Sequence, residues 1–269
     1  MKIGVFDSGL GGLLICKAIR DRLPEPDIIY LGDTLHLPYG NRSQEAIYTY
    51  TRRAMEFLFQ QGCKLIIVAC NTASAAALRQ LQQQWLPQAY SDRRILGVVV
   101  PTLEAAIDSG SHSIGVLATN YITRANIYGD ELQKLNPAIA LHPIAAPLLV
   151  PLIENDGLEW VEPALQRYFA PVQDKGLDSL ILGCTHYPLI RPQVEKILPG
   201  VKILSQDEII PPKLDDYLQR HPEISDEIAR NGSTHFYVSD ITDSYHKAAE
   251  RLYGYALNLE KADLGAGAL

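Results

Sequence analysis

The sequence contains no hydrophobic run long enough to cross a bilayer. A membrane-spanning helix needs about 18 or more consecutive apolar residues, whereas the longest runs here, such as Ile95 to Pro101, have the length of a strand. The start of the chain also lacks the basic segment and uninterrupted apolar stretch of a secretory signal. We therefore expect a cytoplasmic protein with no membrane partner.

Cysteine and positive charge are both scarce. The four cysteines, Cys16, Cys63, Cys70 and Cys184, are widely spread and form no CxxC pair, so neither a disulfide framework nor a zinc knuckle is expected. The net charge is −7 and no basic run is present, which argues against a nucleic-acid partner. A small anionic substrate could still bind through the free N–H groups at helix starts.

Short apolar runs alternate with amphipathic segments along most of the chain. Helical periodicity runs from Gly12 to Leu23 and from Ser43 to Gln61. The expected strands are Ile3–Phe6, Ile28–Leu31, Leu65–Ala69, Ile95–Val99, Ser113–Leu117, Leu141–Ile144, Ser179–Leu182 and Val201–Leu204. This alternation predicts an α/β fold with mainly parallel sheets flanked by helices. In such folds, sites form at the carboxyl ends of the strands.

The sequence also shows an internal duplication. Cys70 and Cys184 each end an apolar strand, are each followed by two polar residues, and lie 114 positions apart. Residues Ile3–Ser8 resemble Ile114–Thr119 at the similar offset of 111 positions. Two matches at nearly one offset favour two similar α/β halves over chance.

The duplication predicts two pseudo-symmetric domains with the active site in the cleft between them. We expect the first domain to comprise residues 1–97 and 211–269, and the second to comprise residues 98–210. Residues after about Pro211 belong to neither repeat, and we expect them to form helices that close back on the first domain.

Cys70 and Cys184 stand where a strand ends and a helix is expected to begin. Free N–H groups and the helix dipole would lower the pKa of a thiol there from about 8.5 toward neutrality. The alternative is a small buried hydrophobic residue, the commonest fate of a free cysteine. Cys16 and Cys63 fit that alternative, but the polar residues after Cys70 and Cys184 favour reactive thiols.

Two thiols, one from each half, suit racemisation in particular. That reaction removes a proton from one face of a stereocentre and returns one to the other face, so it needs two opposed acid/base groups with pKa values near the working pH. Asp7, at the end of the first strand, and His186, two residues after Cys184, are candidate helpers. The plainer alternatives are a helix cap for Asp7 and a loop histidine for His186.

Four motifs resemble the signature segments of bacterial glutamate racemases, in the order and spacing of that family. They are Asp7–Gly12, Pro38–Gly40, Ala69–Ser74 and Leu182–Leu189, and the resemblance extends over residues 3–188. It implies an isomerase that interconverts L- and D-glutamate without pyridoxal phosphate, another cofactor or a metal. It further implies a supply of D-glutamate for peptidoglycan, and hence a role in cell-wall biogenesis and cell shape. We also expect a homodimer.

The resemblance assigns catalysis to Cys70 and Cys184, assisted by Asp7 and His186. The substrate-binding residues that it implies are Asp7, Ser8, Pro38, Tyr39, Gly40, Asn71, Thr72, Thr185 and His186. Asp33 precedes the Pro38 motif as in the family, and we interpret it as a structural loop residue.

The sequence departs from the family in two places and leaves other functions open. Ile122 and Ala125 replace hydroxyl residues, so the resemblance assigns no substrate contact there. Ser205–Asp207 replace a more usual Asp-Ser or Asp-Pro step, so the resemblance assigns no substrate role from there to the end of the chain. A two-cysteine racemase acting on aspartate or a hydantoin would use the same chemistry with a different side-chain pocket. A zinc site built from the four catalytic candidates and a non-catalytic regulator of the same fold are the remaining alternatives. Neither explains two duplicated thiols as well.

Overall fold

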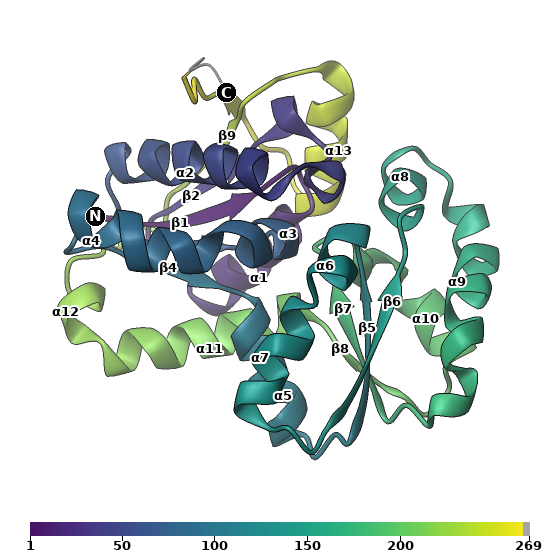
Figure 1. Cartoon of the computed structure of the whole chain (residues 1–269). Helices are drawn as coiled ribbons and strands as arrows, with labels where there is room; N and C mark the ends of the chain where they lie inside the picture. Colours follow the sequence, from purple (N-terminus) through teal and green to yellow (C-terminus); the bar gives the residue numbers. More distant parts are fainter. Residues whose placement is uncertain (266–269) are drawn as a thin grey trace. The chain divides into compact units, whose positions relative to one another are not determined.

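The computed structural model describes residues 1–265 and divides into two compact units, each built around one parallel sheet (Figure 1). Unit 1 consists of Met1–Val98 with Ile210–Leu269, and unit 2 consists of Val99–Ile209. Within residues 1–265, no helix is both long enough and apolar enough to span a membrane.

The sheet of unit 1 has six strands in the order β10-β9-β2-β1-β3-β4. Its strands are β1 (Lys2–Asp7), β2 (Ile28–Gly32), β3 (Cys63–Val68), β4 (Arg94–Gly97), β9 (Thr234–Val238) and β10 (Leu259–Lys261). All of their pairings are parallel. The carboxyl ends of β1, β2 and β3 therefore lie next to one another on the same edge of the sheet.

Helices cover this sheet through apolar faces that the sequence periodicity predicts. In α1, Leu13, Cys16 and Ile19 are buried at helical spacing. Helix α2 begins after Ser43, whose hydroxyl accepts a hydrogen bond from the N–H of Ala46 at 3.2 Å. The helices of unit 1 are α1 (Gly12–Arg22), α2 (Gln44–Gln60), α3 (Asn71–Ala73), α4 (Leu86–Ala89), α12 (Pro222–Ser225) and α13 (Asp243–Tyr253). Helix α11 (Gln206–Arg220) begins in unit 2 and continues into unit 1.

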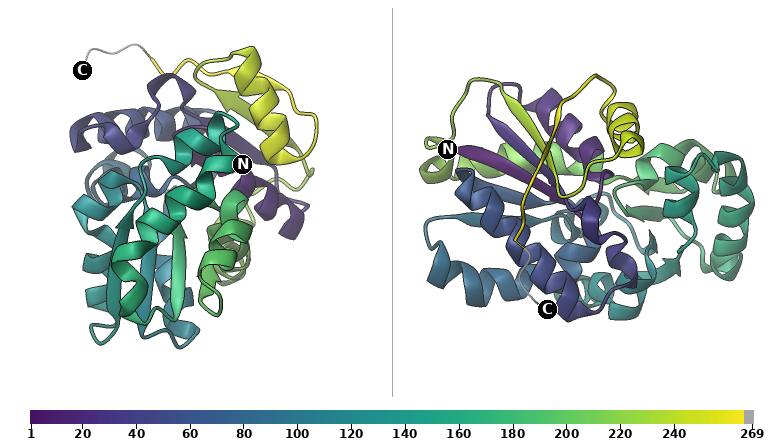
Figure 2. Two further views of the ribbon diagram at one scale, coloured as in Figure 1. Left: turned by 90° about the vertical axis from the view of Figure 1, so that its right-hand side faces the viewer. Right: turned by 90° about the horizontal axis from the view of Figure 1, so that it is seen from above.

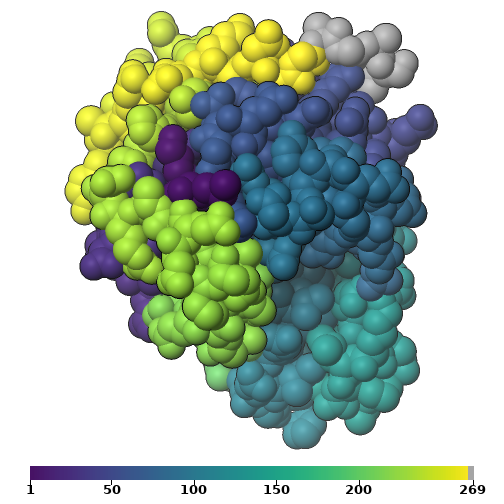
Figure 3. All heavy atoms as spheres, turned by 90° about the vertical axis from the view of Figure 1, so that its left-hand side faces the viewer, coloured from purple at the N-terminus to yellow at the C-terminus, as the bar shows by residue number. Residues whose placement is uncertain are grey.

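The C-terminal segment corrects one expectation. The sequence predicts only helices after Pro211, but β9 and β10 extend the first sheet beyond β2 (Figure 2). Only Phe236 and Val238 of β9 are buried, and two of the three residues of β10 are exposed, so both strands lack the continuous apolar run that reveals the central strands. The N-terminus also contacts this region, since the Met1 ammonium donates to the Glu227 carbonyl at 2.5 Å (Figure 3).

Unit 2 confirms the predicted duplication. Its four parallel strands run in the order β6-β5-β7-β8, which repeats the order β2-β1-β3-β4 of unit 1. They are β5 (Ser113–Ala118), β6 (Ala140–Ala145), β7 (Ser179–Gly183) and β8 (Lys202–Leu204). The helices are α5 (Val99–Asp108), α6 (Asn120–Ala125), α7 (Ile127–Leu135), α8 (Leu149–Glu154), α9 (Val161–Phe169) and α10 (Arg191–Ile197). By this correspondence β3 and β7, which precede the two thiols, occupy equivalent places.

All eight strands expected from the sequence are present, with boundaries that mostly differ by one or two residues and one case in which an expected strand residue belongs to a helix. The run Ile95–Val99 is predicted to be a strand throughout, but β4 ends at Gly97 and Val99 already begins α5. A continuous apolar run does not by itself distinguish a buried strand from the start of a buried helix.

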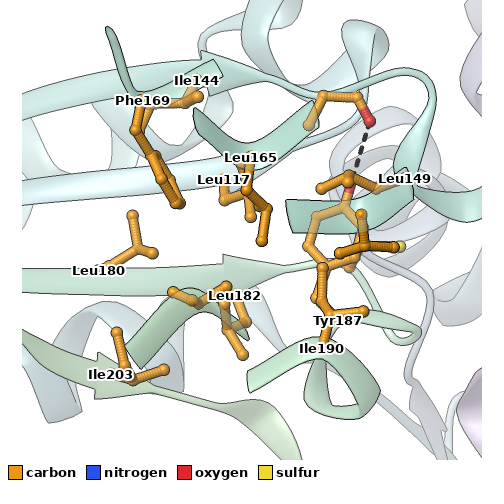
Figure 4. Close-up of a cluster of buried hydrophobic side chains, with 14 of the residues drawn as sticks. Leu117, Ile144, Leu149, Leu165, Phe169, Leu180, Leu182, Tyr187, Ile190 and Ile203 are labelled. Carbon is orange, nitrogen blue, oxygen red and sulfur yellow. Dashed lines mark hydrogen bonds between the residues drawn. The ribbon is translucent and has the colours of Figure 1, made fainter. Parts of the chain in front are cut away.

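The core of unit 2 supports the segment that carries Cys184. Leu180 and Leu182 from β7 pack in one cluster with Phe169 from α9, and Tyr187 belongs to the same cluster (Figure 4). The Tyr187 hydroxyl donates to the carbonyl of Ala146 at 3.2 Å. The loop after β7 is therefore fixed by packing and by a buried hydrogen bond.

Candidate active site

The first group of candidate residues lies at the carboxyl ends of β1, β2 and β3 in unit 1. Asp7 is the last residue of β1 and is 1% exposed. Its Oδ2 accepts hydrogen bonds from the N–H groups of Gly9 at 3.2 Å and Gly12 at 3.1 Å. A Cβ on Gly12 would lie 2.5 Å from the Asp7 Cβ. The glycine turn therefore wraps tightly around one carboxylate oxygen, and Asp7 does bind the start of α1, as the plainer alternative proposes.

Cys70 comes directly after β3 and its neighbour Ala69, and it is the N-cap residue of α3. Its sulfur accepts a hydrogen bond from the N–H of Ala73 at 3.4 Å, and its thiol donates to Oγ of Ser8 at 3.3 Å. Since Ser8 is the chain neighbour of Asp7, the structure brings Asp7, Ser8 and Cys70 together as a single cluster. The N-cap geometry is the helix-start position that the sequence predicts for this thiol.

The electrostatics of Cys70 correct a second expectation. The sequence predicts that the helix start lowers its pKa, but burial of the sulfur and the nearby Asp7 carboxylate raise the pKa of Cys70 to about 12. Hydrogen bonds that Ser8 and the N–H of Ala73 can donate to the thiolate act in the lowering direction and are outweighed. In the protein without substrate, Cys70 is therefore a thiol at neutral pH.

The remaining predicted contacts of unit 1 come from the same strand ends and the loops after them. Asn71 and Thr72, in the first turn after Cys70, are buried, and Ser8 and Gly40 are partly exposed. Pro38 is exposed. These segments offer amide, hydroxyl and backbone N–H donors at the edge where the strands end.

Tyr39 is held by Asp33, a residue that the sequence analysis interprets as part of a structural loop. Asp33 is completely buried and accepts hydrogen bonds from the hydroxyls of Tyr39 and Ser239, both at 2.6 Å. Its two oxygens each lie 2.9 Å from Nδ1 of His36. One carboxylate thereby ties the loop after β2 to the segment after β9. No local motif could have joined Asp33 to Ser239, because the two are 206 positions apart.

The second group lies after β7 in unit 2. Cys184, Thr185 and His186 are all buried. Nδ1 of His186 lies 3.9 Å from the sulfur of Cys184. Cys184 differs from Cys70 in its downstream segment, because a short 3-10 turn over Tyr187–Ile190 precedes α10. Both thiols lie between the end of a strand and a helical segment, but Cys70 is itself the N-cap of its helix whereas Cys184 is separated from α10 by this turn.

His186 has a partner that the sequence did not reveal. Its Nε2 lies 2.9 Å from Oε1 of Glu154 at the end of α8, an ion-pair distance, although the two atoms are not aligned as a hydrogen bond. Burial of the ring opposes its charged form, but the Cys184 sulfur and the Glu154 carboxylate outweigh burial and raise the pKa of His186 to about 10. The ring is thus an imidazolium at neutral pH, beside the second thiol.

Ile122 and Ala125, where family members carry hydroxyl residues, lie on helix α6 of the same unit. Thr119 caps α6 by accepting from the N–H of Ile122 at 3.5 Å, and Ile122 is buried. Tyr128 of α7 is also buried, and its hydroxyl accepts from the amide of Gln206 at 3.3 Å. Burial, followed by the charge of Cys184, raises the pKa of Tyr128 well above its ordinary value. Tyr128 and Gln206 are therefore polar residues near the second thiol that the sequence analysis missed.

The other two cysteines match the buried-hydrophobic interpretation. Cys16 and Cys63 are fully buried, and burial raises the pKa of each to about 12. Over residues 1–265, no group of three or more His, Cys, Asp and Glu side chains has an arrangement that could hold a metal ion.

Comparisons with known proteins identify the family of this chain. Residues 14–208 match the family model described as Asp/Glu/Hydantoin racemase. A glutamate racemase from Dinoroseobacter shibae is 39% identical over 240 residues, which cover 83% of this chain and 86% of the relative. The crystal structure of a glutamate racemase isoform from Bacillus anthracis is 34% identical with a TM-score of 0.89, covering 98% of this chain and 97% of its own.

A second solved structure is that of the glutamate racemase from Francisella tularensis in complex with D-glutamate. It is 32% identical with a TM-score of 0.89, and the match covers 99% of this chain and 98% of that one. The sequence match extends over most of the chain and the structural matches over nearly all of it. The protein is a member of the Asp/Glu/hydantoin racemase family.

Proposed function

We propose that this isomerase is a glutamate racemase that works by a two-thiol mechanism and supplies D-glutamate for peptidoglycan. The observation that carries the proposal is the pair of equivalent thiols, Cys70 after β3 and Cys184 after β7, in a chain with extensive similarity to glutamate racemases. The reaction needs one acid/base group on each face of the α-carbon, and the duplicated fold supplies one from each unit.

In the proposed mechanism, one thiolate removes the α-proton and the opposite thiol returns a proton to the other face. By the family resemblance, Cys70 removes the proton from D-glutamate and Cys184 removes it from L-glutamate. No pyridoxal phosphate or metal takes part in either step. The two proton transfers take place beside charges of opposite sign. The negative Asp7 carboxylate lies near Cys70, whereas the positive His186 imidazolium lies near Cys184.

The imidazolium of His186 lies 3.9 Å from the Cys184 sulfur, on the side of the second proton transfer. The pKa of Cys70 is raised by burial and by the negative charge of Asp7. The ammonium group of the bound amino acid would bring a positive charge to Cys70 and Asp7. Substrate binding itself thus completes the conditions for proton transfer at Cys70.

The carboxylates of the substrate require several donors, because the protein has a net charge of −7. The hydroxyls of Ser8, Thr72 and Thr185, the amide of Asn71 and the N–H groups at the start of α3 are the proposed donors. Tyr39 and Gly40 would line the same site.

One assay tests the function. Purified protein with L-glutamate and no added cofactor should lose the circular-dichroism signal of the amino acid as the racemic mixture forms. Pyridoxal phosphate should not accelerate the reaction and EDTA should not inhibit it. A panel of amino acids separates this proposal from the aspartate and hydantoin alternatives, which predict activity on those compounds and none on glutamate. A homodimer and a cytoplasmic location remain predictions, testable by light scattering and cell fractionation.

A further inference from the structure

We propose that Tyr30 is a positioning residue for the reactive group of unit 1, which consists of Asp7, Ser8 and Cys70. This inference rests on the proposed function. Tyr30 lies on β2, is completely buried, and donates its hydroxyl hydrogen to the carbonyl of Gly9 at 2.7 Å. None of the sequence motifs includes it. Tyr30 would act through Gly9, which contacts Asp7 and is the chain neighbour of Ser8.

Gly9 is the centre of the turn that arranges the reactive group. Its N–H donates to Oδ2 of Asp7 at 3.2 Å, and its chain neighbour Ser8 accepts the hydrogen bond from the Cys70 thiol at 3.3 Å. The carbonyl of the same residue is the atom that Tyr30 holds. The hydrogen bond from Tyr30 thus helps to fix, from the side of β2, the turn against which both Asp7 and Cys70 are oriented.

The backbone of β2 at Gly32 also lies close to the Gly9 carbonyl. A Cβ on Gly32 would lie 2.2 Å from the Gly9 oxygen, so only glycine leaves room there. Tyr30 and Gly32 are two positions apart on one strand and therefore face the same side of the sheet. The Gly9 carbonyl is enclosed by these two residues, with the hydroxyl as its donor.

Tyr30 remains a neutral donor over the whole working range. Burial, followed by the charge of Asp7, raises the pKa of Tyr30 well above its ordinary value. Removing the hydroxyl would leave a buried carbonyl without this donor, which is unfavourable. The turn would then shift, and Asp7 and Ser8 would lose their alignment with Cys70.

This misalignment would affect only one of the two proton transfers. Tyr30 acts on the group that contains Cys70, so its loss would raise the barrier for transfer between Cys70 and the α-carbon. The transfer at Cys184 would keep its own barrier. A general loss of stability would not change the balance between the two.

The test compares Tyr30→Phe with Tyr253→Phe. Tyr253 is a matched control, because it is a buried tyrosine of the same unit and its ring packs on Phe236, as the Tyr30 ring does. The measurements are kcat/KM, Tm, and the primary isotope effects on kcat/KM for D- and L-glutamate deuterated at the α-carbon. For Tyr30→Phe we expect kcat/KM to fall about tenfold, as for a small misplacement of reacting groups.

The isotope effects provide the decisive result. When the transfer at Cys70 becomes more rate-limiting, the isotope effect should rise for deuterated D-glutamate and fall for deuterated L-glutamate. Tyr253→Phe should keep both wild-type isotope effects even if its Tm decreases. Gly32→Ala, which crowds the same Gly9 carbonyl, should shift the two isotope effects in the same directions as Tyr30→Phe.

The outcomes separate this inference from the proposed function. A wild-type protein that racemises glutamate, together with unchanged isotope effects in Tyr30→Phe, would overturn the positioning role and leave the function intact. Equal losses of kcat/KM in both tyrosine variants without a change in isotope effects would also overturn it, by showing a merely structural role. A wild-type protein without glutamate racemase activity would overturn the proposed function itself.

Discussion

The raised pKa of His186 leads to a prediction that can be measured directly. The ring is buried between the sulfur of Cys184 and the carboxylate of Glu154. Its pKa is raised from 6.5 to about 10, a difference that corresponds to about 5 kcal/mol in favour of the imidazolium. Glu154 is partly exposed, so solvent screens its share of this energy.

The sign of the effect on stability follows from linkage. The pKa is higher in the folded protein than in the unfolded chain, so the stabilisation is complete below about pH 6.5. It is lost as the pH rises toward the folded value of about 10. Between these limits the free energy of unfolding should decrease by about 1.4 kcal/mol per pH unit because of His186. His186→Asn should lack this contribution to the slope.

Two measurements check the prediction. The chain has seven histidines, so NMR can follow each ring through a pH titration, with His186→Asn identifying the signal. We expect this ring to remain protonated through pH 8 and to titrate at about 10. Urea unfolding of wild type and His186→Asn at several pH values gives the second measurement, as the difference between their slopes.

A third variant separates the two partners of the ring. Glu154→Gln should lower the pKa of His186 by about one unit or less, since the carboxylate is partly exposed and an exposed pair contributes about 1 kcal/mol or less. The Cys184 sulfur should account for most of the remaining shift. A wild-type His186 that titrates at its ordinary pKa of about 6.5, or equal pH slopes for wild type and His186→Asn, would refute the reasoning.

Three further predictions concern the thiols and the loop of Tyr39. Cys70→Ser and Cys184→Ser should each abolish racemisation, because a hydroxyl is a poor base at neutral pH. With a β-chloro amino acid, Cys184→Ser should eliminate chloride only from the D form and Cys70→Ser only from the L form; loss of the same enantiomer in both would contradict opposed faces. Without substrate, peptide mapping after iodoacetamide treatment should show faster alkylation at Cys184 than at Cys70, because the pKa of Cys70 is raised to about 12. Faster alkylation of Cys70 would contradict this raised pKa. Asp33→Asn should raise KM more than it lowers kcat, because it releases the Tyr39 hydroxyl, and steady-state kinetics with an unchanged KM would contradict that role.

The local motifs are enough to single out the candidate reactive residues. Polar residues directly after apolar strands distinguish Cys70 and Cys184 from the other cysteines, and the glycines after Asp7 mark a turn that wraps around a carboxylate. These signals work because parallel strands end on one edge of a sheet, so strand-end residues converge there. The repeated spacing of the two cysteines likewise predicts the repeated strand order.

The residues that hold the candidate reactive residues in position by hydrogen bonds, ion pairs or packing are not recognisable in the sequence. Asp33 and Ser239 lie 206 positions apart, and Tyr30, Gly32 and Glu154 resemble ordinary strand, turn and helix-end residues. Strands β9 and β10 escape prediction because neither has a continuous apolar run: only two residues of β9 are buried, and β10 has three residues at the sheet edge.

The sequence by itself determined the fold class and the duplication and singled out the two thiols as candidates, because each inference depends on residue types in regular patterns. Only the tertiary structure decided the charge environment of each thiol. Burial and the Asp7 carboxylate raise the pKa of Cys70, while Cys184 and Glu154 keep His186 protonated. A pKa depends on desolvation and on charges within a few ångströms in space, and distant segments of the chain supply both.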